Sequence, residues 1–149
     1  MNNEWKTTSD FKAPEKSPGF LLWKVSTEWR RKVETTLKTL NLTHPQFVLL
    51  ANLSWLTSNK IQLTQIELAR HLSIDITMTS QILRLLEKKG YVERKKKEGD
   101  ERSNLPFLTE SGILLAKKAI PLVESVDRDF FNKLEKDTPK CIEILKKLL

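Results

Sequence analysis

The sequence predicts a mainly α-helical protein that carries one small β-hairpin. Apolar residues recur every three or four positions over most of the chain, which is typical of amphipathic helices. Two Thr residues are each followed three positions later by Gln or Glu, the pattern that opens a helix. Two short extended segments flank a charged turn that contains Gly99-Asp100, which predicts the hairpin.

The N-terminal part divides into an arm and a helix. Residues 1–18 are polar and contain Pro14 and Pro18, so we expect an irregular arm. Residues 19–42 contain one amphipathic helix. Its apolar stripe consists of Leu22, Val25, Trp29, Val33, Leu37 and Leu40.

Two capping boxes predict the next two helices. Thr43 and Gln46 open a helix that should end near Leu56. That helix is apolar nearly all round, which indicates a buried core element. Thr64 and Glu67 open a second, short helix.

A third helix and the hairpin follow. Asp75 is placed to cap this helix, and Gly90 after two lysines is typical of its end. We expect strands at residues 91–94 and 102–108, joined by a charged turn at residues 95–101. Short helix, tight turn, longer helix and hairpin is the order of a winged helix-turn-helix, which we place at residues 43–108.

The region 109–149 predicts two further helices that join two copies of the chain. Thr109 caps a long helix to about Leu134, and Thr138-Pro139 begins the last one. One small winged domain needs less apolar surface than this region carries. The surplus near the C-terminus consists of Phe130, Phe131, Leu134, Ile142, Leu145 and Leu149.

The third helix has two chemically distinct sides when its residues are set about 100° apart. Met78, Ile82, Leu85 and Leu86 fall on one side, which we expect to pack. The opposite side is polar and consists of Thr77, Ser80, Gln81, Arg84 and Lys88.

The polar side suits the major groove of DNA. Gln can pair with adenine, Arg with guanine, and Ser or Thr with either. We therefore expect Thr77, Ser80 and Gln81 to contact base edges, and Arg84 to contact a base or a phosphate. The alternative interpretation is a polar face that is merely solvated.

The hairpin carries a second set of candidates. Arg94, Lys95, Lys96 and Lys97 can follow phosphates. Arg102 can enter the minor groove, and Asp100 can hold its guanidinium by a charge-assisted pair. The alternative is that Asp100 only forms the turn and Arg102 only solvates the edge strand.

Composition agrees with a DNA-binding protein of the cytoplasm. The net charge of +7 favours a polyanionic partner such as nucleic acid, although an anionic membrane surface would also fit. The one cysteine cannot form an intrachain disulfide, which fits a reducing compartment. We expect neither a signal peptide nor a membrane span, because no apolar run is long enough.

The ordered set of these features resembles the MarR family of winged helix-turn-helix regulators. The resemblance covers about residues 18–149, and Ser80 stands where relatives often carry a basic residue. It implies a homodimer, in which the helix of residues 19–42 and the last two helices serve in dimerisation. Such a dimer binds a roughly palindromic operator, usually represses, and releases DNA when a small molecule or oxidant is sensed. It also places Thr79 among the DNA-binding candidates. The matching residues are Leu42-Thr43, Gln46, Glu67-Leu68-Ala69, Thr79, the run 84–94, Asp100, Arg102, Leu108-Thr109 and Gly112.

The sequence says less about an effector. The resemblance implies that Trp23, Trp29 and Trp55 lie on helices that flank a cleft between the DNA-binding and dimerisation parts. With Arg30 for charge, they are candidates for binding a small aromatic ligand; core packing is the alternative. We expect no cofactor and no metal site, because no ligand-like cluster surrounds His44 or His71. Cys141 is interpreted as an inert interface residue.

An enzyme and a protein-binding module are the two alternative classes of function. An enzyme would need a nucleophile with a base, a carboxylate pair or a phosphate-binding loop, and no pattern in the chain indicates one. A winged-helix module that binds protein without specific DNA binding is the remaining alternative. The basic hairpin argues against this alternative, because protein interfaces usually avoid lysine clusters.

Overall fold

The computed structural model describes residues 4–149, except for the side chains of residues 97 and 100–103. It confirms the mainly helical fold with one antiparallel hairpin. The elements are α1 (Trp5–Thr8), η1 (Pro14–Lys16), α2 (Pro18–Lys38), α3 (His44–Ser58), α4 (Gln65–His71), α5 (Ile76–Lys88), β1 (Val92–Lys97), β2 (Asp100–Leu108), α6 (Glu110–Phe131), η2 (Asn132–Asp137) and α7 (Thr138–Lys146).

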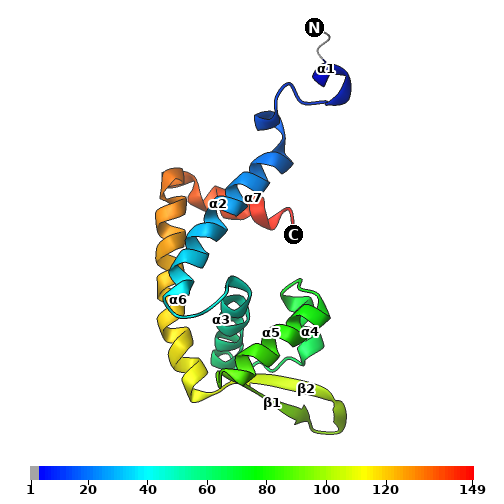
Figure 1. Cartoon of the computed structure of the whole chain (residues 1–149), viewed down its shortest axis with the longest axis vertical. Helices are drawn as coiled ribbons and strands as arrows, with labels where there is room; N and C mark the ends of the chain where they lie inside the picture. Colours follow the sequence, from blue (N-terminus) through cyan, green and yellow to red (C-terminus); the bar gives the residue numbers. More distant parts are fainter. Residues whose placement is uncertain (1–3) are drawn as a thin grey trace.

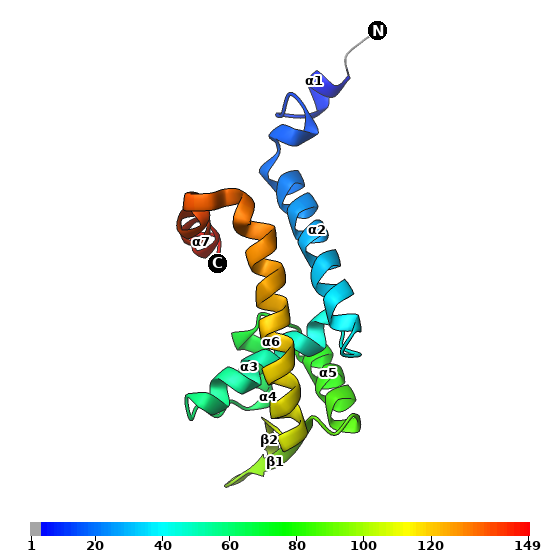
Figure 2. The same cartoon turned by 90° about the vertical axis from the view of Figure 1, so that its left-hand side faces the viewer.

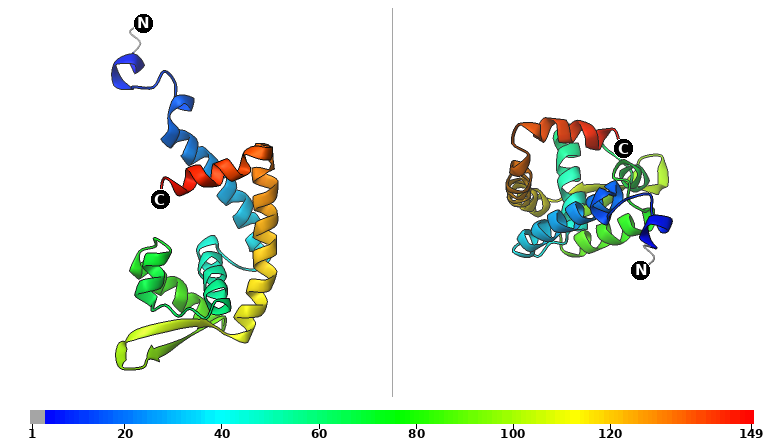
Figure 3. Two further views of the ribbon diagram at one scale, coloured as in Figure 1. Left: turned by 180° about the vertical axis from the view of Figure 1, so that it is seen from behind. Right: turned by 90° about the horizontal axis from the view of Figure 1, so that it is seen from above.

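Two parts of the molecule can be distinguished in Figures 1 and 2. The body comprises α3, α4, α5 and the hairpin (residues 44–108), which gather at one end of α6. The frame comprises α2, α6 and α7; α2 and α6 lie side by side, and α7 turns away at the far end (Figure 2). The N-terminal segment extends beyond both parts, as the view from behind in Figure 3 shows. Among the described residues, none of the helices is both long and apolar enough to cross a bilayer.

The hydrophobic core lies in the body and at the adjoining ends of α2 and α6. α6 contacts both α2 and α3, so it connects the body to the frame. The largest fully buried side chains come from α2, α3, α4, α5 and β1; they are Val33, Leu37, Leu49, Leu50, Leu68, Leu83, Leu86, Val92 and Thr79.

Local hydrogen bonds set the helix starts as the sequence predicts. The backbone N–H of Gln46 donates to the Thr43 hydroxyl, and the Gln46 side chain accepts from the Thr43 backbone. Thr64 and Glu67 form the same reciprocal pair at the start of α4. Each box satisfies backbone donors that a helix start leaves open.

The base of the hairpin is joined tightly to α6. The Thr109 hydroxyl donates to the Gly90 carbonyl at 2.6 Å, and the Thr109 N–H donates to the Tyr91 carbonyl at 3.1 Å. A Cβ at Gly112 would lie 2.0 Å from that same Tyr91 oxygen, so only glycine fits there. The hairpin therefore leaves the body in a direction set by the start of α6.

The structure corrects two element boundaries and the expected conformation of the arm. The strands extend through residues 95–97 and 100–101, which the sequence analysis placed in a turn; the reversal is confined to Glu98 and Gly99, whose φ is +78°. α6 ends at Phe131 rather than near Leu134, and η2 follows it. The arm is not wholly irregular, because α1 and η1 form single helical turns.

Candidate nucleic-acid interface

The turn between α4 and α5 is built by short-range hydrogen bonds. Ser73 adopts a φ of +52°, and its N–H donates to the Arg70 carbonyl at 3.1 Å. Asp75 then caps α5: its Oδ1 accepts from the Met78 N–H at 3.0 Å. The two helices pack against each other, with Leu68 of α4 fully buried. This is the predicted helix-turn-helix.

α5 presents a polar stripe to solvent. Ile82, Leu83 and Leu86 are buried against the body, and the opposite side is open. The exposed polar side chains recur every three or four residues, so they lie in one line along the helix. They are Thr77, Gln81, Arg84 and Lys88, with Ser80 half-buried at one flank.

Thr79 does not belong to this stripe, so its placement among the DNA-binding candidates was wrong. Its side chain is 0% exposed, and its hydroxyl donates to the Asp75 carbonyl at 2.9 Å. The residue lies about 160° around the helix from Gln81, counting about 100° per residue. It therefore packs in the core and holds the first turn of α5.

Met78 and Leu85 also differ from the prediction, which put them on the packed side. They are 48% and 50% exposed and flank the polar stripe. The packed arc of α5 is narrower than its apolar arc, because the body buries Thr79, Ile82, Leu83 and Leu86 and leaves Met78 and Leu85 uncovered. Two apolar side chains therefore lie beside the polar ones on the exposed side of α5.

Arg94 is engaged within the protein, so its predicted phosphate contact remains a prediction. Its side chain is only 20% exposed, and its Nε donates to Oε2 of Glu87 at 3.1 Å, with Nη2 on the same oxygen. Glu87 lies in the last turn of α5, so this ion pair ties the hairpin to the helix. No local sequence pattern joins two residues seven positions apart across a turn.

Lys95 and Lys96 remain exposed on β1 and lie on opposite faces of it. Lys95 pairs across the hairpin with Leu105, and its Nζ lies 4.6 Å from the centre of the Phe107 ring. The side chains of Lys97, Asp100 and Arg102 are not among those that the structure describes. Their contacts with DNA therefore remain predictions from the sequence.

Lys89, next to the stripe, has a structural role that the sequence does not predict. Its Nζ donates to the Asn41 carbonyl at 2.7 Å and to Oε1 of Gln46 at 3.2 Å. The end of α5 is thereby fixed to the loop before α3. A basic residue in a last helical turn is a common pattern, and only the fold reveals its partner.

The four residues proposed for an aromatic ligand do not converge on one pocket. Trp23 is 62% and Trp55 is 53% exposed, on α2 and α3 respectively. Trp29 packs against the core, and its Nε1 donates to Oδ1 of Asp127 at 2.7 Å. Arg30 is exposed on α2. Of the three tryptophans, only Trp29 packs against the core, as the alternative interpretation expected.

His44 links the frame to the body. Its ring meets Trp29 edge to face at 5.1 Å. Burial lowers the pKa of His44, and nearby Arg30 lowers that pKa further, while Glu34 and Asp127 act in the opposite direction. Within the described part of the chain, no three His, Cys, Asp or Glu residues are grouped so as to hold a metal ion.

Comparison with known proteins identifies the family of this chain. Residues 42–103 match the model of the MarR family. The HTH-type transcriptional regulator YdcH of Bacillus subtilis is 43% identical over 128 residues, which is 86% of each chain. The HTH-type transcriptional repressor Rv2887 of Mycobacterium tuberculosis is 38% identical over 73% of this chain and 76% of its own.

Solved structures agree with the sequence relatives. A mutant of MarR from Escherichia coli in complex with operator DNA superposes with a TM-score of 0.77, at 28% identity over 88% of this chain and 92% of that one. The MarR family protein Rv2887 in complex with salicylic acid gives a TM-score of 0.66, at 33% identity over 89% and 96% of the two chains. The chain therefore belongs to the MarR family of transcription regulators.

Proposed function

We propose that this protein is a repressor that binds a roughly palindromic DNA operator as a homodimer. The observation that carries the proposal is the exposed stripe Thr77, Gln81, Arg84 and Lys88 on α5, beside the exposed lysines of β1. A helix with such a side fits the major groove, where each base pair shows a distinct pattern. The net charge of +7 favours the approach to DNA.

Each side chain is assigned a role by its chemistry. Thr77, Ser80 and Gln81 lie in the first half of α5 and read base edges, while Arg84 contacts a base or a phosphate. Lys88, Lys95, Lys96 and Lys97 contact phosphates. Arg102 enters the minor groove, and Asp100 orients it.

A second copy of the chain supplies the second DNA-binding helix that a palindromic operator requires. α7 buries none of its residues, and its apolar side chains Ile142 and Leu145 are exposed in a single chain. The outer half of α2 exposes Leu22 and Val25 in the same way. Burying both surfaces in a two-fold dimer would set the two α5 helices about 34 Å apart, one turn of DNA.

Release from DNA by a small molecule completes the proposal. The related Rv2887 structure contains salicylic acid. Such a regulator acts where the DNA is, in the cytoplasm, and works by binding rather than by catalysis.

A binding titration tests the proposal. An operator is first selected from random DNA, and its affinity is measured by fluorescence anisotropy at two salt concentrations. Gln81→Ala should lower affinity by about 1–3 kcal/mol at one base step and relax the preference there. Lys96→Ala should weaken all sequences alike and reduce the salt slope by about 1.

Lys140→Ala is the matched control, because Lys140 is an exposed lysine of α7. Figure 1 shows α7 at the end of α6 that lies opposite the hairpin. The Lys140→Ala substitution should leave DNA affinity unchanged. If no DNA sequence is selected, or if Gln81→Ala weakens every sequence equally, base reading by α5 is wrong. Binding of protein partners without DNA selection would favour the winged-helix interaction module instead.

A further inference from the structure

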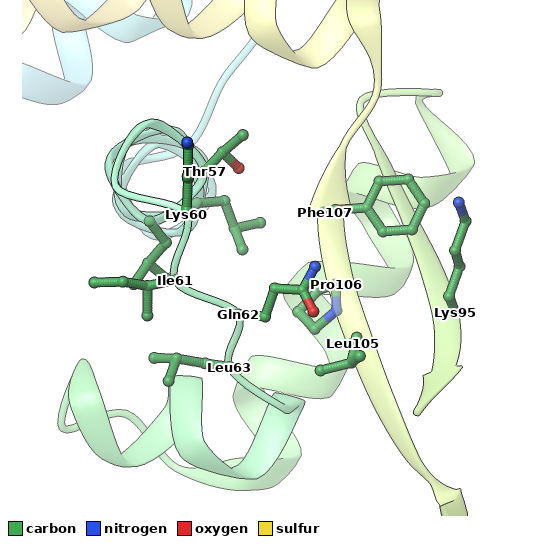
Figure 4. Close-up of a pocket in the computed structure, with 11 residues that line it drawn as sticks. Thr57, Lys60, Ile61, Gln62, Leu63, Lys95, Leu105, Pro106 and Phe107 are labelled. Carbon is green, nitrogen blue, oxygen red and sulfur yellow. The ribbon is translucent and has the colours of Figure 1, made fainter. Parts of the chain in front are cut away.

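A cavity of about 440 Å³ opens between the end of α3, the segment that leads to α4, and the hairpin. Figure 4 shows this segment running between the end of α3 and strand β2, with the Gln62 side chain extending toward Pro106. The cavity is distinct from the polar stripe of α5, and none of the tryptophans weighed above lines it. Its volume is in the range that holds a small organic ligand.

The lining is aliphatic with a cationic rim. Leu53 and Leu56 of α3 are 3% exposed, and Ile61, Leu63 and Leu105 add further branched side chains. The charged residues that line it are Lys60 and Lys95, both positive; none of the lining residues that the structure describes is acidic. A ligand matched to this lining has an apolar body and a negative end.

The Lys95 ammonium at the rim is positioned to pair with that negative end. Lys95 lines the cavity and holds its Nζ over the Phe107 ring at 4.6 Å. None of the ion pairs formed by the described residues joins this ammonium to a carboxylate. Because this ammonium already covers a face of Phe107, the remaining lining favours an aliphatic chain over an aromatic ring. The carbonyls at the end of α3, which would repel an anion, already accept hydrogen bonds: Ile61 N–H donates to Leu56 at 2.9 Å and Lys60 N–H to Thr57 at 3.1 Å.

We propose that this cavity binds a medium-chain aliphatic carboxylate, with its chain among Leu53, Leu56 and Ile61 and its carboxylate paired with Lys95. The consequence for regulation rests on the proposed function. Lys95 is also a candidate phosphate contact on the hairpin, and one ammonium cannot serve a ligand carboxylate and a DNA phosphate equally well. Occupation of the cavity therefore weakens DNA binding.

Octanoate is the probe, and its binding to the full chain is measured first without DNA. We expect saturable binding of one octanoate per chain, with the largest amide shifts in NMR spectra at Gln62, Leu105 and Phe107. Lys95→Met should raise the Kd at least about tenfold, because it removes a charge-assisted contact but keeps the apolar stem. Octan-1-ol, of equal chain length but uncharged, should bind at least about tenfold more weakly.

Lys96→Met is the matched control, because Lys96 follows Lys95 on the same strand and does not line the cavity. It should change the octanoate Kd less than about twofold, as an exposed charge outside the site does. Equal weakening by both variants, equal affinity for octan-1-ol, or tighter binding of benzoate than of octanoate would overturn the site or the ligand class. So would amide shifts centred on α2 and α7.

The second arm adds operator DNA. Octanoate at saturation should weaken the operator affinity of the unmodified chain several-fold and leave that of Lys95→Met unchanged. Octanoate binding without any effect on DNA affinity would overturn the coupling. Because the first arm contains no DNA, a failure of the proposed DNA binding cannot be mistaken for a failure of the cavity.

Discussion

The body and the frame bury their apolar residues to very different degrees. Helices α3 and α5 bury Leu49, Leu50 and Leu83 completely, whereas α7 buries no residue at all. α6 shows the change within one helix: its buried residues run from Gly112 to Val123, and none follows. The body thus completes its core within one chain, and the frame leaves apolar surface that a second copy can cover.

The strongest test of this difference is Leu83→Ala in α5. Leu83 is 0% exposed, so truncation should lower the free energy of unfolding by about 2–5 kcal/mol through lost burial and a cavity. Leu85→Ala is the control two residues away, at 50% exposure, and should cost less than about 0.5 kcal/mol. Urea titrations followed by circular dichroism measure both. Equal losses would mean that α5 does not face the body as described.

The frame is tested by placing charge on α7. Ile142→Asp with Leu145→Asp should raise the dimer Kd about a hundredfold, which is about 2.8 kcal/mol, because both side chains are exposed in one chain and would be buried in the dimer. Sedimentation velocity gives the mass. Ile66→Asp with Leu85→Asp replaces two exposed apolar residues of the body and should leave the mass unchanged. A double variant on α7 that keeps the dimer mass would exclude α7 from the interface.

A smaller loss of stability is expected when the N-terminal cap of α5 is removed. Asp75→Ala removes the carboxylate that accepts from the Met78 N–H, and should cost about 1 kcal/mol of stability. Asp75→Asn keeps an acceptor and should recover most of that loss. Thermal unfolding of the three proteins gives the comparison. A full loss in Asp75→Asn would show that charge, rather than the cap, matters at this position.

The smallest effect concerns His44, where the frame meets the body. Its pKa is lowered in the folded chain, so the unfolded chain binds the proton more readily. Stability is therefore complete well above pH 6.5, falls as the pH drops through 6.5, and stops falling once the folded state is protonated too. His44→Gln should flatten this part of the profile of unfolding midpoint against pH. A variant that keeps the full slope would assign the slope to another group.

Sequence reasoning succeeded where the interaction is local. The caps at Thr43, Thr64 and Asp75 each join residues three positions apart, so their partners can be seen in the sequence. It did not reveal the burial of Thr79 or the ion pair of Arg94, because both depend on elements that pack from elsewhere. The order of the elements indicated the family correctly, and the family model and relatives confirm it.

The sequence by itself determined the helices, their caps, the hairpin and the polar stripe of α5, because hydrogen bonding and helical periodicity act over a few residues. Only the tertiary structure decided which apolar arc of α5 is covered, which arginine is held by Glu87, and that a cavity opens beside the hairpin. Those features depend on distances between segments far apart in the chain. A one-dimensional pattern does not contain such distances, and packing sets them.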